Sequence, residues 1–498
     1  MAERLFSELT IIILCGFVPN LQKKEVEQLC QSFFDNFRKL LDFQVRLSSK
    51  SYCYGDAAIF AIAVSGGADS TCMAWLMHML QKQRNVQVIA LIVDHGLRDD
   101  SAEEAYQVRN YLQDRMKIES HVLRWEECKP KSNVHYHARH ARYNLLTNYC
   151  LKYNIRYLCT AHNKDDQAET VLLRILRGSG IGGICGIPEI NYMNDIIILR
   201  PLLIFRREVI EKILNFYELH WVDDPSNTSA KYDRAKLRVL LNSFTTHQVI
   251  QSNEMLVNRL VLLSENAARA HNYIETVLHE KLANLCKISE IGSVLLDCNE
   301  FMNLHSEIAL RMLRYILQYV GGNEYCTRLR SLELLLMQLW DIKNFKNATL
   351  GKCKIIRIFD KNTDSTKSIL FFKELKFVDV GKYELMPGQE LLWDSRIFFK
   401  REIVVSCCSV GEEVNQLYVA PISADALQYV KKELGQRVGG INLLLFCNEA
   451  LMTMPVVYAE SNKPILYPLL NIADKRYVTK NSALPKIRAR FKTQWIFK

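Results

Sequence analysis

Residues 58–70 read Ala-Ile-Phe-Ala-Ile-Ala-Val-Ser-Gly-Gly-Ala-Asp-Ser, and this stretch decides the fold class. The run from Ala58 to Val64 is apolar throughout, which is typical of a strand buried on both faces of a sheet. Helical periodicity follows over 69–81. The six residues from Ser65 to Ser70 therefore join a strand to a helix. At such a junction, glycines and the first N–H groups of the helix can surround an anion.

The chain on either side continues this alternation. A helix is expected over 22–42, before the first strand. The following list gives the other expected elements: strands over 86–93, 120–123, 157–160 and 196–199, and helices over 101–115, 133–152, 164–177 and 207–217. The pattern Ser101-Ala-Glu-Glu104 predicts a capping box at one helix start. The alternation predicts a parallel, Rossmann-like sheet with helices on both faces, which binds ligands beyond the carboxyl ends of its strands.

The remainder of the chain divides into two further regions. Helical periodicity runs from about 240 to 345, and short β-like runs with one helix at 424–434 follow from about 350. The expected segments are an N-terminal extension or helix over 1–50, an α/β catalytic domain over 51–238, an all-helical domain over 239–347 and a mixed, β-rich C-terminal domain over 348–498. A chain of 498 residues suits two to four domains of ~100–200 residues.

Composition excludes several classes of protein. A hydrophobic fraction of 49% and a charged fraction of 24% are ordinary for globular proteins, which argues against disorder, collagen or coiled coil. The apolar run Ile11–Val18 is too short to span a membrane. The 15 cysteines include no CxxC pair, which argues against a disulfide framework, a zinc ribbon or an iron–sulfur cluster built from such pairs. We expect buried, reduced thiols in a cytoplasmic protein.

The formal charge of +10 is concentrated at one end of the chain. Residues 475–498 hold eight basic residues and no Asp or Glu, which leaves +2 for the first 474 residues. Aromatic residues are interleaved with these charges, as in a surface that contacts phosphates and stacks on bases. A solvated tail, or a terminal strand with one basic face, explains the same composition.

The loop from Ser65 to Ser70 carries the strongest chemical information. Gly66 and Gly67 let the backbone approach a phosphate, and Ser65 and Ser70 add hydroxyl donors. Asp69 would repel a phosphate unless a cation such as Mg2+ lies between them. A plain helix cap is the alternative, because Asp and Ser are good cap residues.

Further polar residues follow two other expected strands. Asp94 and His95 end the strand over 86–93, while Asp165 and Asp166 follow the strand over 157–160. Together with Asp69, these carboxylates are expected at one edge of the sheet, where they can hold Mg2+, bind a cationic substrate or act as a base. Alternatively, Asp165 and Asp166 only cap a helix through its dipole.

One motif is excluded by its position. Gly178-Ser-Gly-Ile-Gly-Gly183 fits the pattern GxGxxG, but it follows a helix, whereas a dinucleotide-binding fingerprint follows a strand. We expect a helix end with a left-handed glycine, then a flexible loop. The absence of GxxxxGK[ST] disfavours transfer of a γ-phosphate by a Walker-type site.

In this context, Ser65–Ser70 resembles the SGGxDS loop of the PP-loop ATP pyrophosphatases, which cleave ATP to AMP and pyrophosphate. The wider combination resembles the tRNA(Ile)-lysidine synthase family. The matching segments are Ser65–Ser70, Asp94–Arg98, Ala138–Tyr143, His162–Thr170, Arg174, Arg177–Gly180, Arg200–Leu202, Trp221–Asn227, Arg234 and Arg238. One departure is Asn163, because the family usually has two consecutive histidines here. An amide keeps hydrogen bonding but takes no proton near neutral pH.

The resemblance implies a two-step reaction with ATP, Mg2+, L-lysine and an isoleucine tRNA that carries a CAU anticodon. ATP would adenylate the C2 carbonyl oxygen of the wobble cytidine, and the ε-amine of lysine would then displace AMP to leave lysidine. The tRNA would then read AUA instead of AUG and be charged with isoleucine instead of methionine.

The resemblance also implies roles for individual residues, with Asp69 at the metal and Asp166 at the amine or the metal. Arg142 and Arg234 would contact phosphates or the flipped base, and His162 would orient the cytidine or relay a proton. The remaining candidates are Ser65, Gly66, Gly67, Ala68, Ser70, Asp94 and His95 for ATP, Asp165 and Glu169 for lysine or metal, and Arg177, Arg238, Lys486, Arg488 and Arg490 for tRNA. Surface salt bridges for the arginines and a satisfied core histidine are the structural alternatives.

Other functions remain open from the sequence. Another PP-loop enzyme, such as a tRNA thiolase, would typically use cysteine pairs or a catalytic cysteine. A non-catalytic nucleotide- or RNA-binding protein would keep the loop but would not need the carboxylates. The sequence is compatible with a homodimer as well as with a monomer.

Overall fold

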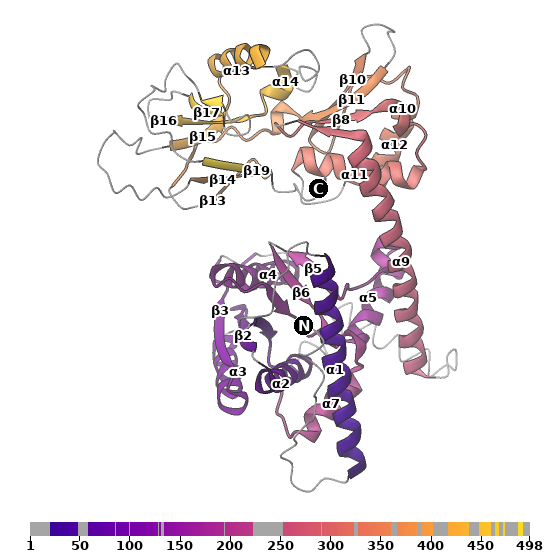
Figure 1. Cartoon of the computed structure of the whole chain (residues 1–498), viewed down its shortest axis with the longest axis vertical. Coiled ribbons are helices and arrows are strands. Elements are labelled where there is room, and N and C mark those ends of the chain that lie inside the picture. Colours follow the sequence, from indigo (N-terminus) through magenta and orange to yellow (C-terminus); the bar gives the residue numbers. More distant parts are fainter. Residues whose placement is uncertain are drawn as a thin grey trace, which may run out of the picture. The chain divides into compact units, whose positions relative to one another are not determined.

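The computed structural model (Figure 1) divides the chain by its internal contacts into two units, Met1–His271 and Asn272–Lys498. It describes residues 20–47, 58–84, 86–98, 100–127, 129–130, 134–193, 195–222, 252–289, 291–322, 327–359, 366–386, 390–401, 417–437, 448–459, 464–467, 472–473 and 487–491. The boundaries between the four expected segments remain a prediction. Among the described helices, none has the length and apolar character needed to cross a membrane.

The first unit is built on a six-stranded sheet with the order β3-β2-β1-β4-β6-β5. Its strands are β1 (Ala58–Val64), β2 (Val86–Asp94), β3 (Glu119–Arg124), β4 (Tyr157–Cys159), β5 (Ile190–Met193) and β6 (Ile196–Leu199). Five strands are parallel, and β5 joins the edge as an antiparallel partner of β6. The predicted parallel α/β sheet is therefore confirmed. The sequence did not indicate β5, because its four half-exposed or exposed residues form no apolar run.

Alternate residues of β1 point into two separate cores, so helices cover both faces of the sheet. Phe60, Ile62 and Val64 pack in the core that contains α1 (Asn20–Leu47), α2 (Ala68–Gln83), α3 (Ser101–Met116) and α7 (Arg207–Phe216). Ala61 and Ala63 pack with α4 (Val134–Lys152). The expected lead-in helix is α1, and its Phe37 ring lies 5.3 Å from the ring of Phe60. Thus α1 forms part of the core on this face of the sheet. Figure 1 shows α1 as a long helix beside the strands of the first unit.

The buried His78 of α2 predicts that the first unit loses stability in mild acid. The side chain is 3% exposed, and burial, aided by Lys82, lowers its pKa from 6.5 to about 4. The pKa of His78 is lower in the folded than in the unfolded state, so neutral His78 contributes fully to the free energy of unfolding above pH 6.5. This contribution is lost as the pH falls towards 4, and the loss reaches ~2 kcal/mol at pH 5. We expect His78→Gln to lose less stability than wild type between pH 7.5 and 5 in urea unfolding.

The exposed His137 of α4 offers a matched control for this pH experiment. His137→Gln should keep the pH dependence of the wild-type protein, because the substituted side chain lies on the surface and the buried His78 stays in place. Equal acid sensitivity of His78→Gln and wild type would contradict the assignment.

The second unit begins within α9 (Asn253–Leu285) and contains a five-stranded sheet of order β7-β8-β11-β10-β9. Its strands are β7 (Cys286–Ile288), β8 (Val294–Asp297), β9 (Ala348–Leu350), β10 (Cys353–Phe359) and β11 (Thr366–Lys373). Three helices pack with this sheet: α10 (Cys298–Phe301), α11 (Ser306–Gly321) and α12 (Leu329–Trp340). The sequence indicated α9, α11 and α12 but not the β7–β8 hairpin. These strands are too short to show a period, and β8 is held by pairing with the distant β11.

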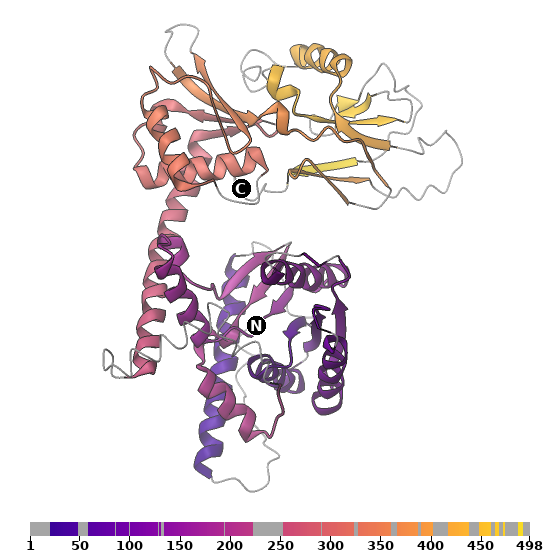
Figure 2. The same ribbon diagram turned by 180° about the vertical axis from the view of Figure 1, so that it is seen from behind.

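Two smaller antiparallel sheets complete the C-terminal part, as the β-rich prediction requires (Figure 2). One has the order β12-β15-β16-β17-β18 and the other β13-β14-β19. Their strands are β12 (Tyr383–Glu384), β13 (Glu390–Trp393), β14 (Ile397–Arg401), β15 (Leu417–Pro421), β16 (Pro455–Ala459), β17 (Pro464–Tyr467), β18 (Ile472–Ala473) and β19 (Ile487–Phe491). Two helices accompany them, α13 (Ala424–Arg437) and α14 (Asn448–Leu451). Within the basic tail, β19 pairs with β14, so a terminal strand is found at these residues.

Candidate functional site

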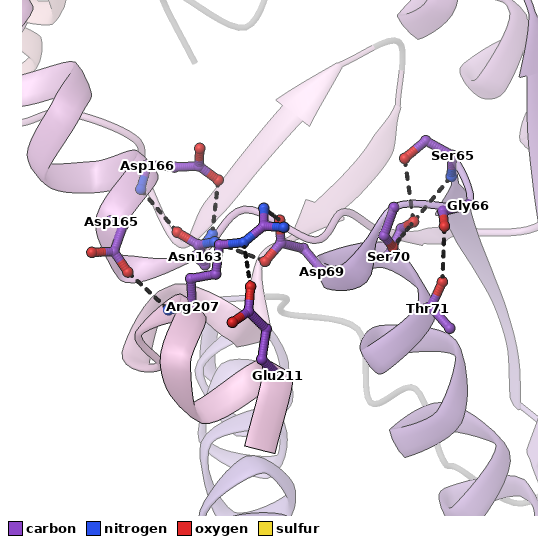
Figure 3. A network of polar contacts seen from close by, with 11 residues as sticks. Ser65, Gly66, Asp69, Ser70, Thr71, Asn163, Asp165, Asp166, Arg207 and Glu211 are labelled. Carbon is purple, nitrogen blue, oxygen red and sulfur yellow. Dashed lines mark hydrogen bonds and ion pairs between the residues drawn. The ribbon is translucent and has the colours of Figure 1, made fainter. Parts of the chain in front are cut away.

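The candidate site lies at the carboxyl edge of three neighbouring strands. The strand β1 lies between β2 and β4 in the sheet and is parallel to both. The loop Ser65–Ser70 follows β1, Asp94 and His95 come at the end of β2, and His162–Asp166 follow β4. The predicted convergence on one edge is confirmed, and Figure 3 shows the part in which the loop meets the helix after β4.

Within the loop, Gly66 has a conformation that only glycine adopts easily. Its φ is +85°, and a Cβ atom there would lie 2.6 Å from Cγ2 of Val108. The carbonyl of Gly66 accepts a hydrogen bond from the N–H of Val222 at 2.9 Å. Gly67 is different, because a Cβ atom there would make only ordinary contacts, the nearest at 3.7 Å from the Ser65 hydroxyl. The fold therefore requires glycine at position 66, whereas Gly67 leaves open space at the start of α2.

The hydroxyl of Ser70 shapes the loop from inside. It accepts from the N–H of Ser65 at 3.1 Å (Figure 3). It also donates to the carbonyl of Gly67 at 3.0 Å. Ser70 is buried whereas Ser65 is exposed. The first-turn N–H groups of α2 are not used within the helix, since its hydrogen bonds begin at Thr71. These groups can therefore receive an anion.

The two glycines predict different defects on substitution. Gly66→Ala should unfold at a lower temperature than wild type, because a left-handed Ala and the clash with Val108 cost about 1–3 kcal/mol. Gly67→Ala should keep the wild-type melting temperature but lose at least ~10-fold in ATP affinity, because its methyl group would lie where a phosphate approaches the helix. Thermal unfolding with and without ATP measures both effects. A stable Gly66→Ala protein, or unchanged ATP binding by Gly67→Ala, would contradict this division of roles.

Asp69 lies in the first turn of α2 and contacts two other elements. Its Oδ1 accepts from Nδ2 of Asn163 at 2.8 Å, and its Oδ2 lies 3.5 Å from Nη1 of Arg207. Arg207 belongs to α7 and also donates through Nε to Glu211 at 2.9 Å. The carboxylate is therefore fixed by one neutral and one cationic donor (Figure 3).

Arg207 is a site residue that sequence reasoning missed. A signal was present, because Arg206 and Arg207 stand at the start of a helix, where the dipole disfavours cations. Two adjacent arginines in that position indicate that carboxylates lie nearby. Sequence alone could not say which ones, since 138 positions separate Asp69 from Arg207.

The start of α5 (Lys164–Leu176) contains a capping box between Asn163 and Asp166. The Oδ1 of Asn163 accepts from the N–H of Asp166 at 2.9 Å, and the N–H of Asn163 donates to Oδ2 of Asp166 at 3.1 Å. Asp165 instead accepts from the N–H of Arg207 and from Nε of Arg206, both at 2.8 Å. Both carboxylates thus have structural partners, and Asp165 joins the start of α7 to the start of α5.

The capping box predicted at Ser101 is wrong. The N-cap of α3 is Asp100, which makes no side-chain capping bond, and the Ser101 hydroxyl donates to Oδ1 of Asp94 at 2.8 Å. The same oxygen of Asp94 accepts from the N–H of Gly96 at 2.8 Å. Asp94 is 3% exposed and so uses its carboxylate to hold the loop between β2 and α3. The Ser101 hydroxyl therefore bonds to the buried carboxylate of Asp94 and not to the backbone at the start of α3.

His95 lies close enough to Arg142 of α4 for the two groups to interact electrostatically. Burial lowers the pKa of His95, and the charges of Arg142 and Lys129 lower it further against the opposing effect of Asp94. Burial raises the pKa of Tyr143, but the charges of Arg139, Arg200 and Arg142 outweigh it and leave this pKa lowered. These arginines, from α4 and the end of β6, therefore form a positive environment suited to phosphate or a nucleobase.

The remaining candidates are placed as follows. The half-buried His162 has Nδ1 3.2 Å from the Thr160 hydroxyl, and Glu169 is buried in α5. Arg177 is exposed at the end of α5. Arg488 and Arg490 belong to β19, while Arg234, Arg238 and Lys486 lie outside the described residues. The roles expected for these residues remain predictions.

The glycine-rich segment after α5 has the helix-end structure expected for it. Gly178 has a φ of +65°, and the N–H groups of Gly178 and Ser179 donate to the carbonyls of Ile175 and Arg174. This is a Schellman ending of a helix. The short helix α6 (Ile181–Ile184) follows, in place of the flexible loop that was expected. The segment does not follow a strand, so it is not a dinucleotide-binding fingerprint.

The part of the chain that the structure describes contains no group of three or more His, Cys, Asp and Glu side chains arranged to hold a metal. Asp69 alone offers a half-exposed carboxylate at the loop. One or two carboxylates plus substrate phosphates are the usual ligands of Mg2+ in nucleotide sites. The residues present therefore fit a magnesium ion that arrives with a nucleotide.

Three comparisons place the chain among known proteins. A family model described as a PP-loop domain matches residues 39–244. A tRNA(Ile)-lysidine synthase of Wolbachia pipientis wMel is 32% identical over 416 residues, which cover 83% of this chain and 89% of the relative. One from Anaplasma marginale (strain St. Maries) is 30% identical over 429 residues, covering 83% and 86%.

A solved structure, the U34-tRNA thiolase NcsA of Methanococcus maripaludis with its 4Fe-4S cluster, has 17% sequence identity and a TM-score of 0.38 over 50% of this chain and 82% of that chain. At this TM-score, the likeness carries no argument about function.

Proposed function

Because this chain belongs to the tRNA(Ile)-lysidine synthase family, we propose that it attaches L-lysine to C2 of the wobble cytidine in the CAU anticodon of isoleucine tRNA. The reaction consumes ATP, proceeds through an adenylated cytidine and releases AMP and pyrophosphate. The observation that carries the proposal is the row Asp69–Asn163–Asp166, which joins the nucleotide loop to a second carboxylate through three hydrogen bonds. A neighbouring pair of sites for ATP and for an amine is what a two-step ligation needs.

In the first step, the loop and α2 bind the phosphates of ATP. The first-turn N–H groups, which form no hydrogen bond within the helix, and the dipole of α2 favour the negative charge that develops on pyrophosphate. Arg142, with Arg139 and Arg200 nearby, stabilises the phosphates or the base of the cytidine. Asp69 is the residue that would hold Mg2+, which when bound neutralises phosphate charge and favours departure of pyrophosphate.

In the second step, Asp166 receives the substrate lysine. Its Oδ2 is bound to the N–H of Asn163, while its half-exposed side chain also presents Oδ1, which has no hydrogen-bond partner among the described atoms. This carboxylate can bind the ε-ammonium group and accept a proton from it. The amine then forms the bond to C2, and the C2–O bond to AMP breaks. Asp165, bound by Arg206 and Arg207, serves to hold the site together.

The two steps can be tested separately. With ATP and isoleucine tRNA but without lysine, the protein should release pyrophosphate and accumulate adenylated tRNA. Addition of lysine should then release AMP. In this assay, Asp166→Ala should still release pyrophosphate but need a higher lysine concentration. Wild-type pyrophosphate release that does not depend on tRNA would contradict the proposal. A variant with full product formation and an unchanged lysine dependence would remove Asp166 from its role.

Two further parts of the proposal concern the cellular compartment and the binding partner. The proposed compartment is the cytoplasm, which agrees with the eight described cysteines being free thiols, seven of them buried. The proposed partner is isoleucine tRNA, for which the basic tail and Arg177 supply cationic groups.

A further inference from the structure

Asn163 makes three hydrogen bonds with Asp69 and Asp166 in the candidate site. The residue is 3% exposed. Its Oδ1 accepts from the N–H of Asp166 at 2.9 Å, which determines the orientation of the amide, because only an oxygen can accept there. The Nδ2 group therefore faces Oδ1 of Asp69 at 2.8 Å. The third bond runs from its own N–H to Oδ2 of Asp166 at 3.1 Å (Figure 3).

These bonds connect two carboxylates that would otherwise be independent. Asp69 belongs to α2 and Asp166 to α5, which follow different strands of the sheet. Two carboxylates in one site repel each other and drift apart unless donors hold them. One buried amide supplies the donor to Asp69 and the cap that holds Asp166. An asparagine that only caps a helix does not need the bond from its Nδ2 group to Asp69.

We infer that Asn163 is a positioning residue for the proposed reaction, which sets the place of Asp69 relative to Asp166 in addition to capping α5. The inference rests on the proposed function, since Asp69 serves the nucleotide and Asp166 serves the amine. It also gives a reason for the departure at this position. An amide fulfils the positioning role without carrying a proton, so this role does not require a histidine.

Substitutions at Asn163 can separate the cap from the link to Asp69. Serine is nearly as good an N-cap as Asn, but its short side chain cannot also donate to Asp69. Histidine can supply both, with one ring nitrogen accepting and the other donating. The chain itself shows that a histidine can cap a helix, because Nδ1 of His305 accepts from the N–H of Glu307 at 3.3 Å at the start of α11.

The experiment measures the first-step rate and thermal stability for Asn163→Ser, Asn163→His and the matched control Asn148→Ser on the exposed face of α4. Pyrophosphate release is followed with ATP and isoleucine tRNA in the absence of lysine. We expect Asn163→Ser to keep the wild-type melting temperature within ~2 °C. Its rate of pyrophosphate release should fall about 10–100-fold, through a lower kcat more than through a changed KM for ATP. Asn163→His should recover most of this loss, and Asn148→Ser should behave as wild type.

Two outcomes would overturn the inference. One is a wild-type rate in Asn163→Ser, which would show that the residue only caps α5. The other is an equal loss in Asn163→Ser and Asn163→His, which would show that the donor to Asp69 has no effect. Failure of the proposed function looks different, because the wild-type protein itself would then release no tRNA-dependent pyrophosphate. In that case, the ATP-induced rise in melting temperature still compares the variants and tests whether Asn163 orders the nucleotide loop.

Discussion

Replacing Asp69 with Asn is expected to lower the rate of pyrophosphate release about 1000-fold, the upper range for loss of one preorganised electrostatic contact in an active site. The substitution keeps the size and the planar shape of the side chain but removes the charge that faces Arg207. It also removes the carboxylate that fits Mg2+. The fold should change little, since a half-exposed carboxylate in a first helical turn contributes only ~0.3–1 kcal/mol.

Glu211 provides the matched control for this experiment. It accepts from Nε of the same arginine at 2.9 Å and contacts no described residue of the loop, so Glu211→Gln removes one negative charge beside Arg207 and leaves Asp69 intact. We expect a reduction of no more than ~10-fold for this variant. The assay is single-turnover pyrophosphate release with saturating ATP and isoleucine tRNA. If Asp69→Asn kept a tenth of the wild-type rate, Asp69 would not be the residue that serves the metal.

Replacing Asp394 with Ala is expected to destabilise the second unit by about 3–5 kcal/mol, the usual cost of removing one partner of a buried ion pair. Asp394 is 7% exposed. Its Oδ1 lies 2.5 Å from Nζ of Lys373, and its Oδ2 accepts from Nε of Arg396 at 2.8 Å. Both cations are themselves buried, so the substitution leaves two positive charges next to each other without their shared anion.

A second variant isolates the charge from the backbone conformation at Asp394. The residue has a φ of +55°, which Asn tolerates better than Ala. Asp394→Asn should therefore lose only the stability that depends on the carboxylate charge, which is most of the loss expected for Asp394→Ala. The control Glu280→Ala, at an exposed position, should change stability by less than ~0.5 kcal/mol. Urea unfolding measures all three. A loss below ~1 kcal/mol in Asp394→Ala would mean that the buried cluster does not hold these strands together.

The same cluster shows what sequence could and could not predict in the second unit. The role of the stretch Leu392–Arg396 cannot be derived from its residues alone. In the structure, it ends β13 and forms the turn to β14, and Arg396 reaches the carbonyls of Val320 and Thr453 in two distant segments. Local pattern predicts a strand or a turn. It does not predict which distant backbone groups a buried guanidinium will bind.

The first unit was more predictable because its signals are local. A run of seven apolar residues followed by two glycines determines where β1 ends and where α2 begins. Parallel topology then brings the ends of β1, β2 and β4 together without any further information. The link from Asp69 to Asn163 spans 94 positions, and only the tertiary structure brings the start of α2 to the start of α5. The misassigned capping box at Ser101 has the same cause, because a distant carboxylate competes for the hydroxyl.

A labelled-lysine assay shows whether this chain forms lysidine on isoleucine tRNA. The protein is incubated with ATP, Mg2+ and labelled L-lysine, in parallel with isoleucine tRNA and methionine tRNA that both carry a CAU anticodon. We expect ATP-dependent label in isoleucine tRNA alone, located at the wobble cytidine after digestion to nucleosides. Absence of label from isoleucine tRNA, or equal labelling of both tRNAs, would contradict it.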